Sequence, residues 1–163
     1  MGQIKLGRVD HRLIHGQVMT KWSKGLGINA IFVIEDSIAN DDFMKDIFIN
    51  SGAKSGIHVE VYSQDEAIKY WEDRQFDDYS VIILFQSIKG AYETIKKGLP
   101  VPSLNIGGVA KKKNSQFVIP SAAIVLDEYN QLKELQVDGV DLFFQTVPDS
   151  PKVSMNEADK KFS

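Results

Sequence analysis

A histidine with two arginines before it is the part of this sequence best suited to chemistry. His15 follows Arg8 and Arg12 closely, and Gly16 comes directly after it. A neutral imidazole is a nucleophile near pH 7, and guanidinium groups hold phosphoryl oxygens in a fixed fork. The pattern after Gly16 predicts a helix, whose first N–H groups also bind anions. Together these residue types indicate phosphoryl chemistry at His15.

Each charged neighbour of His15 has both a functional and a structural interpretation. Arg12 lies three residues before His15, which suits a place beside a phosphoryl group; as a structural residue it is a solvated loop charge. Arg8 either points into the site or pairs with Asp10. Asp10 orients His15, anchors Arg12, or only caps the turn. We expect His15, Arg12, Arg8 and Asp10 to be the catalytic residues.

Polar groups from three loops are expected to hold the phosphate. The helix start after His15 supplies the first of them. Gln86 and Ser87 follow a strongly apolar run and offer a polar rim or a helix cap. Paired glycines mark a tight turn or, after a strand, bring backbone amides to a phosphate. The predicted phosphate-binding residues are Gly16, Gln17, Val18, Gln86, Ser87, Asn105, Gly107 and Gly108.

Three other features receive no catalytic role. His11 is interpreted as an exposed neighbour of the site, and His58, far along the chain, as unrelated to it. Lysines 111–113 are interpreted as a solvated charge run, with attraction of an acidic partner surface as the alternative. No cluster of metal-ligating residues stands out in the sequence, so neither a metal nor another cofactor is predicted.

Composition narrows the class of protein. The length of 163 residues fits a single domain over 1–163 with a sizeable core. A hydrophobic share of 43% with 25% charged residues is typical of a soluble globular domain. The net charge of −3 gives no reason to expect nucleic-acid binding. The absence of cysteine excludes disulfides, thiolate catalysis and cysteine-based metal sites.

The expected location is the cytoplasm. No apolar run approaches the length of a membrane span, and a strand-like run begins almost at the first residue, where a signal peptide would stand. Any connection with a membrane is therefore expected to be peripheral and to come through partner proteins.

Apolar runs alternate with amphipathic stretches along the chain. Predicted strands cover residues 4–9, 30–35, 58–62, 80–85, 104–106, 122–126 and 140–147. Predicted helices cover 15–26, 40–51, 64–74, 87–97 and 128–136. This alternation predicts an α/β fold, with an open, mainly parallel sheet of about seven strands and helices on both faces. The polar tail after Pro148 is expected to follow the surface or fray.

The predicted topology brings the candidate residues together. Ligands of open parallel sheets bind beyond the carboxyl ends of the strands, near a change in strand order. The first predicted strand ends shortly before His15, the fourth before Gln86, and the fifth before Gly107. The three loops are therefore predicted to surround one site. Aromatic residues at core-like spacing are assigned to packing, namely Trp22, Tyr70, Trp71, Phe143 and Phe144.

The segment Arg-Val-Asp-His-Arg-Leu-Ile-His-Gly-Gln-Val, at 8–18, resembles the signature of a known family. It is similar to that of the IIB components of the mannose/fructose/sorbose family of bacterial sugar phosphotransferase systems. Leu-Asn-Ile-Gly-Gly at 104–108 resembles the second active-site loop of that family, and 122–147 resembles its C-terminal end. The resemblance therefore covers nearly the whole chain.

The resemblance implies a phosphocarrier. His15 would accept a phosphoryl group, through Nδ1, from a phosphohistidine of a IIA domain. It would then pass the group to a sugar held by the membrane subunits IIC and IID, and Arg12 would support the transfer. Mannose, fructose, sorbose and amino sugars such as N-acetylgalactosamine all remain open, and so does the oligomeric state.

Two other classes of protein also stay open at this stage. A histidine phosphatase or mutase has a His-Gly pair, but it places an arginine directly before the histidine, where this chain has Ile14. It also needs a second catalytic histidine. A non-catalytic α/β regulatory or nucleotide-binding module is the other class, although neither a G-x-G-x-x-G nor a Walker sequence is present.

Overall fold

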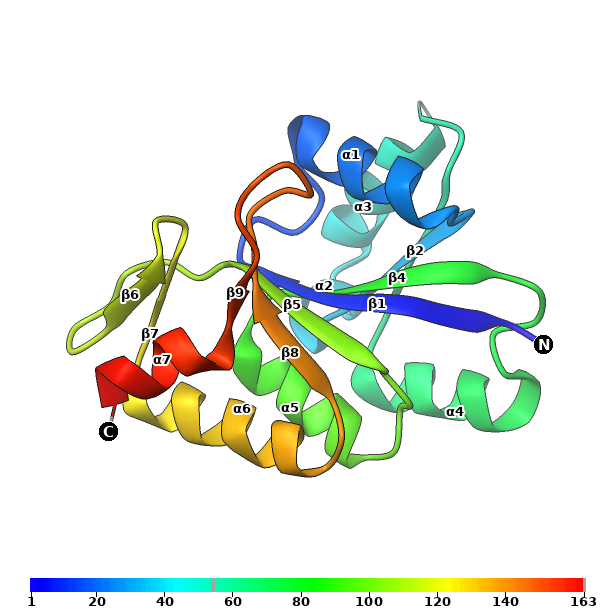
Figure 1. The fold of residues 1–163 in the computed structure, drawn as a ribbon. Helices are drawn as coiled ribbons and strands as arrows, with labels where there is room; N and C mark the ends of the chain where they lie inside the picture. The colour runs from blue at the N-terminus through cyan, green and yellow to red at the C-terminus, as the bar shows by residue number, and fades with distance from the viewer. Residues whose placement is uncertain (54, 163) are drawn as a thin grey trace.

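A seven-stranded open sheet forms the centre of the protein (Figure 1). The computed structural model describes residues 1–53 and 55–162, with the side chains of 16–19 excepted. The sheet runs in the order β3 (His58–Tyr62), β2 (Ala30–Ile34), β4 (Ser80–Phe85), β1 (Gln3–Asp10), β5 (Ser103–Gly108), β8 (Asp141–Phe144) and β9 (Val153–Ser154). Its pairings are parallel except for that of β8 with β9. The predicted fold class is confirmed.

Helices cover both faces of this sheet (Figure 1). One face packs against α1 (Gly16–Leu26), α2 (Asp36–Ala39) and α3 (Asp42–Ala53). The other packs against α4 (Gln64–Arg74), α5 (Ile88–Lys96), α6 (Leu126–Val137) and α7 (Met155–Phe162). Two hydrophobic clusters result, one on each side of the sheet.

The central strands are apolar because both of their faces are covered. All five residues of β2 are buried, and so are the last five of β4. Alternate residues of β2 enter opposite clusters: Ile31 and Val33 pack under α1, while Phe32 and Ile34 face α4. This arrangement explains why both strands read as continuous apolar runs rather than alternating patterns. The aromatic residues assigned to packing lie in or against these clusters, as predicted.

Residues 122–126 were expected to form a strand of the main sheet, and that expectation is wrong. β7 (Ala122–Ile124) instead pairs antiparallel with β6 (Gln116–Ile119) in a separate two-stranded ribbon. The ribbon extends beyond the carboxyl end of β5 (Figure 1). β6 is only four residues long, and Phe117 is exposed while only Ile119 is buried, so this short run does not enter the core of the main sheet.

The tail after Pro148 does not fray. It forms β9, the antiparallel edge strand, and then α7, whose Met155 and Ala158 are buried against the core. Two apolar residues three positions apart suffice to dock a short helix on a prepared surface. α7 is further fixed by Tyr129, which donates a hydrogen bond to Asp159 at 2.6 Å and stacks on Phe162.

The topology brings three loops together at one edge. β1 lies between β4 and β5, so the carboxyl ends of these three strands are neighbours. In register, Val9 lies opposite both Phe85 and Ile106. The chain leaves β1 for α1 on one face of the sheet and leaves β4 for α5 on the other. This is the change of strand order at which open α/β sheets place their ligands.

Candidate functional site

A buried carboxylate, that of Asp10, is the centre of the site. Asp10 is the last residue of β1 and is fully buried. Its Oδ2 accepts hydrogen bonds from His15 Nε2 at 2.9 Å and from Arg8 Nη2 at 3.0 Å. Its Oδ1 accepts from the backbone N–H of Arg12 at 3.0 Å and from Arg12 Nε at 3.2 Å. Three of the four predicted catalytic residues thus converge on the fourth.

The surroundings of Asp10 decide its protonation. Burial by itself raises the pKa of a carboxyl group. Here the hydrogen bonds from His15 and Arg12 and the charge of Arg8 act more strongly in sum, and the pKa of Asp10 falls to about 2. Asp10 is therefore an ionised group that can only accept hydrogen bonds at neutral pH.

An ionised Asp10 fixes the tautomer of His15. Since the carboxylate accepts, His15 Nε2 must carry the hydrogen of the 2.9 Å bond. In the neutral ring the lone pair then resides on Nδ1. The His15 side chain is 22% exposed, so the ring is held at the surface rather than enclosed. The geometry thus leaves one defined nitrogen, Nδ1, with a free lone pair at the surface.

Arg8 lies beneath this pair and cannot reach solvent. It is fully buried, and its guanidinium donates to Asp10, to Asn105 Oδ1, and to the carbonyl oxygen of Gln145 at 3.2 Å. It also lies 5.4 Å from the ring centroid of Trp22 in α1. Burial lowers the pKa of Arg8, against the opposing effect of the neighbouring Asp10 carboxylate. Of the two interpretations of Arg8, the structure supports pairing with Asp10.

The paired glycines of β5 make room for these buried charges. A Cβ added to Gly107 would overlap the guanidinium of Arg8, and one added to Gly108 would lie 2.7 Å from Asp10 Oδ1. The carbonyl oxygen of Gly108 accepts from the backbone N–H of His11 at 3.0 Å. Both glycines therefore lie within β5, where they contact Arg8 and Asp10. They form neither a tight turn nor a phosphate-binding loop.

A short turn returns the chain from Asp10 to His15. The backbone N–H of Leu13 donates to the carbonyl oxygen of Asp10 at 2.9 Å, and Leu13 adopts a φ of 57°. A left-handed conformation costs a non-glycine residue about 1–2 kcal/mol. Burial of the Leu13 side chain, which is 1% exposed, offsets this cost. Leu13 therefore anchors the turn that brings Arg12 and His15 to one carboxylate, a role that its apolar type does not reveal.

The site carries a positive charge and an open helix start. Arg8 and Arg12 against Asp10 leave one formal positive charge when His15 is neutral. His15 is the N-cap residue of α1, its side chain makes no capping hydrogen bond, and the first turn contains no acidic residue. The first N–H groups of α1 are thus available to an anion bound beside His15. Gly16, Gln17 and Val18 begin this helix, but their side chains lie outside the described part of the structure.

The other predicted residues divide between rim, cap and core. Arg12 is 44% exposed at the side chain, and Gln86 is exposed beyond the carboxyl end of β4. Ser87 caps α5, accepting from the backbone N–H of Gly90 at 3.0 Å, so the interpretation as a helix cap is confirmed. Asn105 is fully buried and donates to the carbonyl oxygen of Gln145 at 3.0 Å, which places it below the site.

The remaining histidines lie where they were expected. His11 is exposed, and its Nδ1 is 4.0 Å from Asp10 Oδ1. His58 belongs to the edge strand β3 and stacks on Tyr79, with ring centroids 4.9 Å apart. Two strands separate β3 from β1, so His58 is not a second histidine for chemistry at His15. This placement disfavours a phosphatase or mutase.

Some contributors to the site were not predicted. The carbonyl oxygen of Gln145 accepts from both Arg8 and Asn105, and Trp22 lies against Arg8. Trp22 Nε1 also donates to the carbonyl oxygen of Thr146 at 3.3 Å, tying α1 to the loop after β8. The contacts of Arg8 with Gln145 and of Trp22 with Thr146 join segments more than a hundred residues apart, so no local sequence pattern predicts them.

Two general features of the described residues bear on function. Within 1–53 and 55–162, no group of three or more histidine, aspartate or glutamate side chains is placed to hold a metal ion. None of the helices in the same part of the chain is long and apolar enough to cross a membrane.

Comparison with known proteins places the chain among subunits of sugar phosphotransferase systems (PTS). The family model "PTS system sorbose subfamily IIB component" matches residues 4–162. The sorbose-specific EIIB component of Klebsiella pneumoniae is 30% identical over 153 residues, which are 94% of this chain and 93% of that protein. The mannose-specific EIIAB component of Escherichia coli K12 is 27% identical, and the match covers 97% of this chain and 49% of that protein.

Solved structures agree with this placement. The crystal structure of manxB from Thermoanaerobacter tengcongensis superposes with a TM-score of 0.91 at 38% identity, covering 99% of this chain and 98% of that one. The match of the family model and the similarity over almost the whole length lead to one conclusion. The chain belongs to the sorbose-subfamily IIB components, the phosphoryl-carrying subunits of sugar phosphotransferase systems.

Proposed function

We propose that this protein carries the phosphoryl group on Nδ1 of His15. The group comes from a phosphohistidine of a IIA domain and goes to a sugar held by the membrane subunits IIC and IID, as in a protein-N(π)-phosphohistidine–sugar phosphotransferase of the mannose family. The observation that carries the proposal is the 2.9 Å hydrogen bond between His15 Nε2 and the ionised Asp10. It leaves Nδ1 as the nitrogen with a free lone pair.

Both steps of the transfer balance without a cofactor. In the first, the lone pair of Nδ1 attacks phosphorus, the donor's P–N bond breaks, and its electron pair returns to the donor imidazole. In the second, a sugar hydroxyl attacks phosphorus and releases its proton to solvent, and the electron pair of the breaking P–Nδ1 bond returns to the His15 imidazole. Phosphoryl transfer depends mainly on in-line positioning and charge stabilisation. An imidazole held in one orientation, in a site with a net positive charge, meets both requirements.

The residues around His15 have two proposed roles, binding of the phosphoryl group and positioning of the imidazole. Arg12 is half exposed and within reach of incoming phosphoryl oxygens, so it is the side chain proposed to hold the transferring group. The first N–H groups of α1 add donors on the other side of His15. Asp10 and Arg8 do not touch the phosphoryl group in this proposal; they are positioning residues that fix the imidazole. Gln86 belongs to the exposed rim that a partner meets.

One relative supports the proposed phosphoryl donor. The E. coli relative named EIIAB joins an A and a B component in one protein, and this chain matches about half of it. That arrangement supports a IIA domain as the phosphoryl donor. A phosphocarrier serving IIC and IID would work in the cytoplasm, at the membrane surface, through those subunits. We treat 1–163 as one IIB domain, since β1 and β9 share a sheet.

Sugar choice is expected to lie with the membrane subunits. Relatives of 26 to 30% identity carry the names of sorbose, mannose, fructose and N-acetylgalactosamine systems. Their similarity to this chain is nearly uniform, so the IIB sequence does not separate the four.

Phosphorylation of the purified protein tests the proposal. The protein is incubated with phosphoenolpyruvate, the general phosphotransferase proteins and a IIA domain, and its intact mass is measured. We expect a gain of one acid-labile phosphoryl group, absent in His15→Ala and retained in His11→Ala, a matched change in the same loop. Nitrogen NMR of labelled histidine should place the group on Nδ1. A label that persists in His15→Ala would overturn the assignment.

A further inference from the structure

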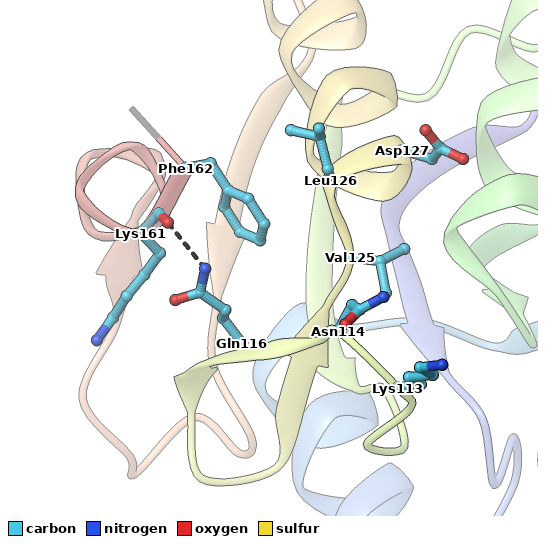
Figure 2. Close-up of a pocket in the computed structure, with 8 residues that line it drawn as sticks. All are labelled: Lys113, Asn114, Gln116, Val125, Leu126, Asp127, Lys161 and Phe162. Carbon is cyan, nitrogen blue, oxygen red and sulfur yellow. Dashed lines mark hydrogen bonds between the residues drawn. The ribbon is translucent and has the colours of Figure 1, made fainter.

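An open groove lies between the β6–β7 ribbon, the start of α6 and the end of α7 (Figure 2). Its volume is about 540 Å³. Figure 2 shows Leu126 and Phe162 facing it from α6 and α7, with Lys113 and Lys161 on opposite sides. A hydrogen bond from Gln116 Nε2 to the carbonyl oxygen of Lys161, 3.0 Å long, joins the ribbon to α7. The lining is therefore mixed: apolar side chains stand among polar ones, and Asp127 lines the groove together with the two lysines.

Positive charge gathers around this groove although the chain is acidic overall. Lysines 111–113 lead into β6, and Lys160 and Lys161 end α7. Lys112 pairs with Glu128 at 2.9 Å and Lys160 with Glu157 at 3.0 Å. The five lysines against Glu128, Glu157 and the groove-lining Asp127 leave a local charge of +2, where the whole chain carries −3. In the described part of the chain, Lys111, Lys113 and Lys161 have no salt-bridge partner.

Large apolar side chains are exposed among these lysines. Leu126 is 53% exposed and Phe117 on β6 is 48% exposed. Lysines beside exposed apolar residues are the combination that suits the headgroup level of an anionic membrane, where ammonium groups meet phosphates and apolar groups enter the acyl boundary.

The groove lies at the same edge of the molecule as the site. Val109, directly after Gly108, bridges to Ala122 at the start of β7, and Ser121 Oγ donates to the carbonyl oxygen of Gly107 at 2.7 Å. Figure 1 shows the ribbon, the start of α6 and the C-terminus beyond the carboxyl end of β1, with the N-terminus at the opposite end. A surface that brought His15 toward membrane subunits would therefore also bring the groove toward the lipids around them.

We propose that this lysine-sided groove binds the anionic headgroup of a membrane phospholipid and so turns the carboxyl edge of the sheet toward the bilayer. The functional benefit of this orientation rests on the proposed function, in which His15 passes its phosphoryl group to a sugar held by membrane subunits. Each lysine near an anionic surface changes affinity about fivefold. Binding by a few lysines is weak, which suits a carrier that must leave the membrane to be recharged.

Vesicle sedimentation with the intact protein tests this proposal. Vesicles of phosphatidylcholine with one third phosphatidylglycerol are compared with pure phosphatidylcholine, without any phosphate donor. We expect binding to the anionic vesicles only, weakened as salt rises and screens the charges. Lys113→Glu combined with Lys161→Glu should reduce the affinity at least tenfold. Leu126→Ser should reduce it less and leave its salt dependence unchanged.

A matched double variant supplies the control. Lys5→Glu with Lys24→Glu makes the same change of charge on exposed lysines at the start of β1 and the end of α1, away from the groove. It should bind vesicles as the unmodified protein does. Equal loss in both double variants, or equal binding to neutral and anionic vesicles, would overturn the proposal. Loss of IIA binding with unchanged vesicle binding in the groove variant would also overturn it, in favour of an acidic protein.

The groove proposal and the phosphocarrier proposal can be overturned separately. His15→Ala should bind anionic vesicles normally, because the groove does not include His15. If His15 is not phosphorylated but vesicle binding depends on Lys113 and Lys161, the lipid-binding proposal is supported and the phosphocarrier proposal is overturned. If phosphorylation succeeds and vesicle binding is absent, only the groove proposal falls.

Discussion

The carboxylate of Asp10 and Nε2 of His15 lie 2.9 Å apart, one fully buried and the other at the surface. This contact links the interior of the sheet to the proposed chemistry. Arg8 and the backbone and side chain of Arg12 hold the carboxylate from other directions, so its orientation is fixed by β1, β5 and the turn together. A fixed carboxylate can hold the imidazole in one orientation and one tautomer through repeated cycles of phosphorylation.

Asp10→Asn tests the control of the tautomer. An amide can donate or accept, so His15 Nε2 is no longer forced to carry the hydrogen. We expect both neutral tautomers in nitrogen NMR of histidine-labelled protein and a phosphotransfer rate at least about tenfold lower. His11→Ala, in the same loop, should change neither measurement. A single Nε2–H tautomer surviving in Asp10→Asn would show that another group orients the ring.

Acid should remove the stability that Asp10 contributes. The pKa of Asp10 is about 2 in the folded protein, against 3.8 for the ordinary group. Because the folded pKa is the lower one, the contribution is complete above pH 4 and is lost as pH falls toward 2. Its size is roughly 2 kcal/mol. Urea unfolding between pH 5 and pH 2 should show a steeper loss in the unmodified protein than in Asp10→Asn; equal slopes would contradict the assignment.

Arg12→Lys separates phosphate binding from structure. Arg12 is half exposed, but its side chain donates to the buried Asp10, so its replacement should lower the free energy of unfolding by about 1.5 kcal/mol, the lower end for a hydrogen bond to a charged group. Lysine keeps the charge but lacks the fork that grips two phosphoryl oxygens, so transfer should slow markedly. Arg74→Lys is the control, because Arg74 is an exposed arginine on α4 that pairs with Asp77 at 2.9 Å. Unchanged transfer in Arg12→Lys would reduce Arg12 to a structural partner of Asp10.

Local signals predicted the fold well where burial dominates. β2 and β4 are covered on both faces, and their continuous apolar runs predicted them within a residue. The helix predicted at Gln64–Arg74 has those bounds, and the structure shows that Ser63 and Glu66 form a capping box at its start. β6 and α7 were not predicted, because β6 is only four residues long and α7 owes its place to Met155 and Ala158, which dock on a surface formed by distant segments.

Within the site too, local sequence signals predicted some features and long-range contacts determine the others. The types and spacing of Arg8, Asp10, Arg12 and His15 indicated phosphoryl chemistry, and these four residues do lie together. Which arginine is buried depends on contacts with Asn105 and Gln145, about a hundred residues away or more, and no spacing reveals such contacts. The glycine pair was visible in the sequence. Its purpose becomes visible only when β5 is placed beside β1 in register.

Gly107→Ala tests whether the glycine pair serves the buried charges. A Cβ at this position would overlap the guanidinium of Arg8, which has no free space because it also contacts Asp10, Asn105 and Gln145. Forced displacement in a packed interior typically costs about 1–3 kcal/mol. We expect that loss in urea unfolding, together with slower phosphotransfer, because Asp10 would shift with Arg8.

Gly25→Ala is the matched control for that change. Gly25 lies inside α1, and nothing stands within 4 Å of an added Cβ. Alanine is favoured over glycine within a helix by up to about 1 kcal/mol, so this variant should be as stable as the unmodified protein or more stable, with normal transfer. If Gly107→Ala behaved like Gly25→Ala, the guanidinium of Arg8 would have room to move, and Arg8 would not be the fixed support of Asp10.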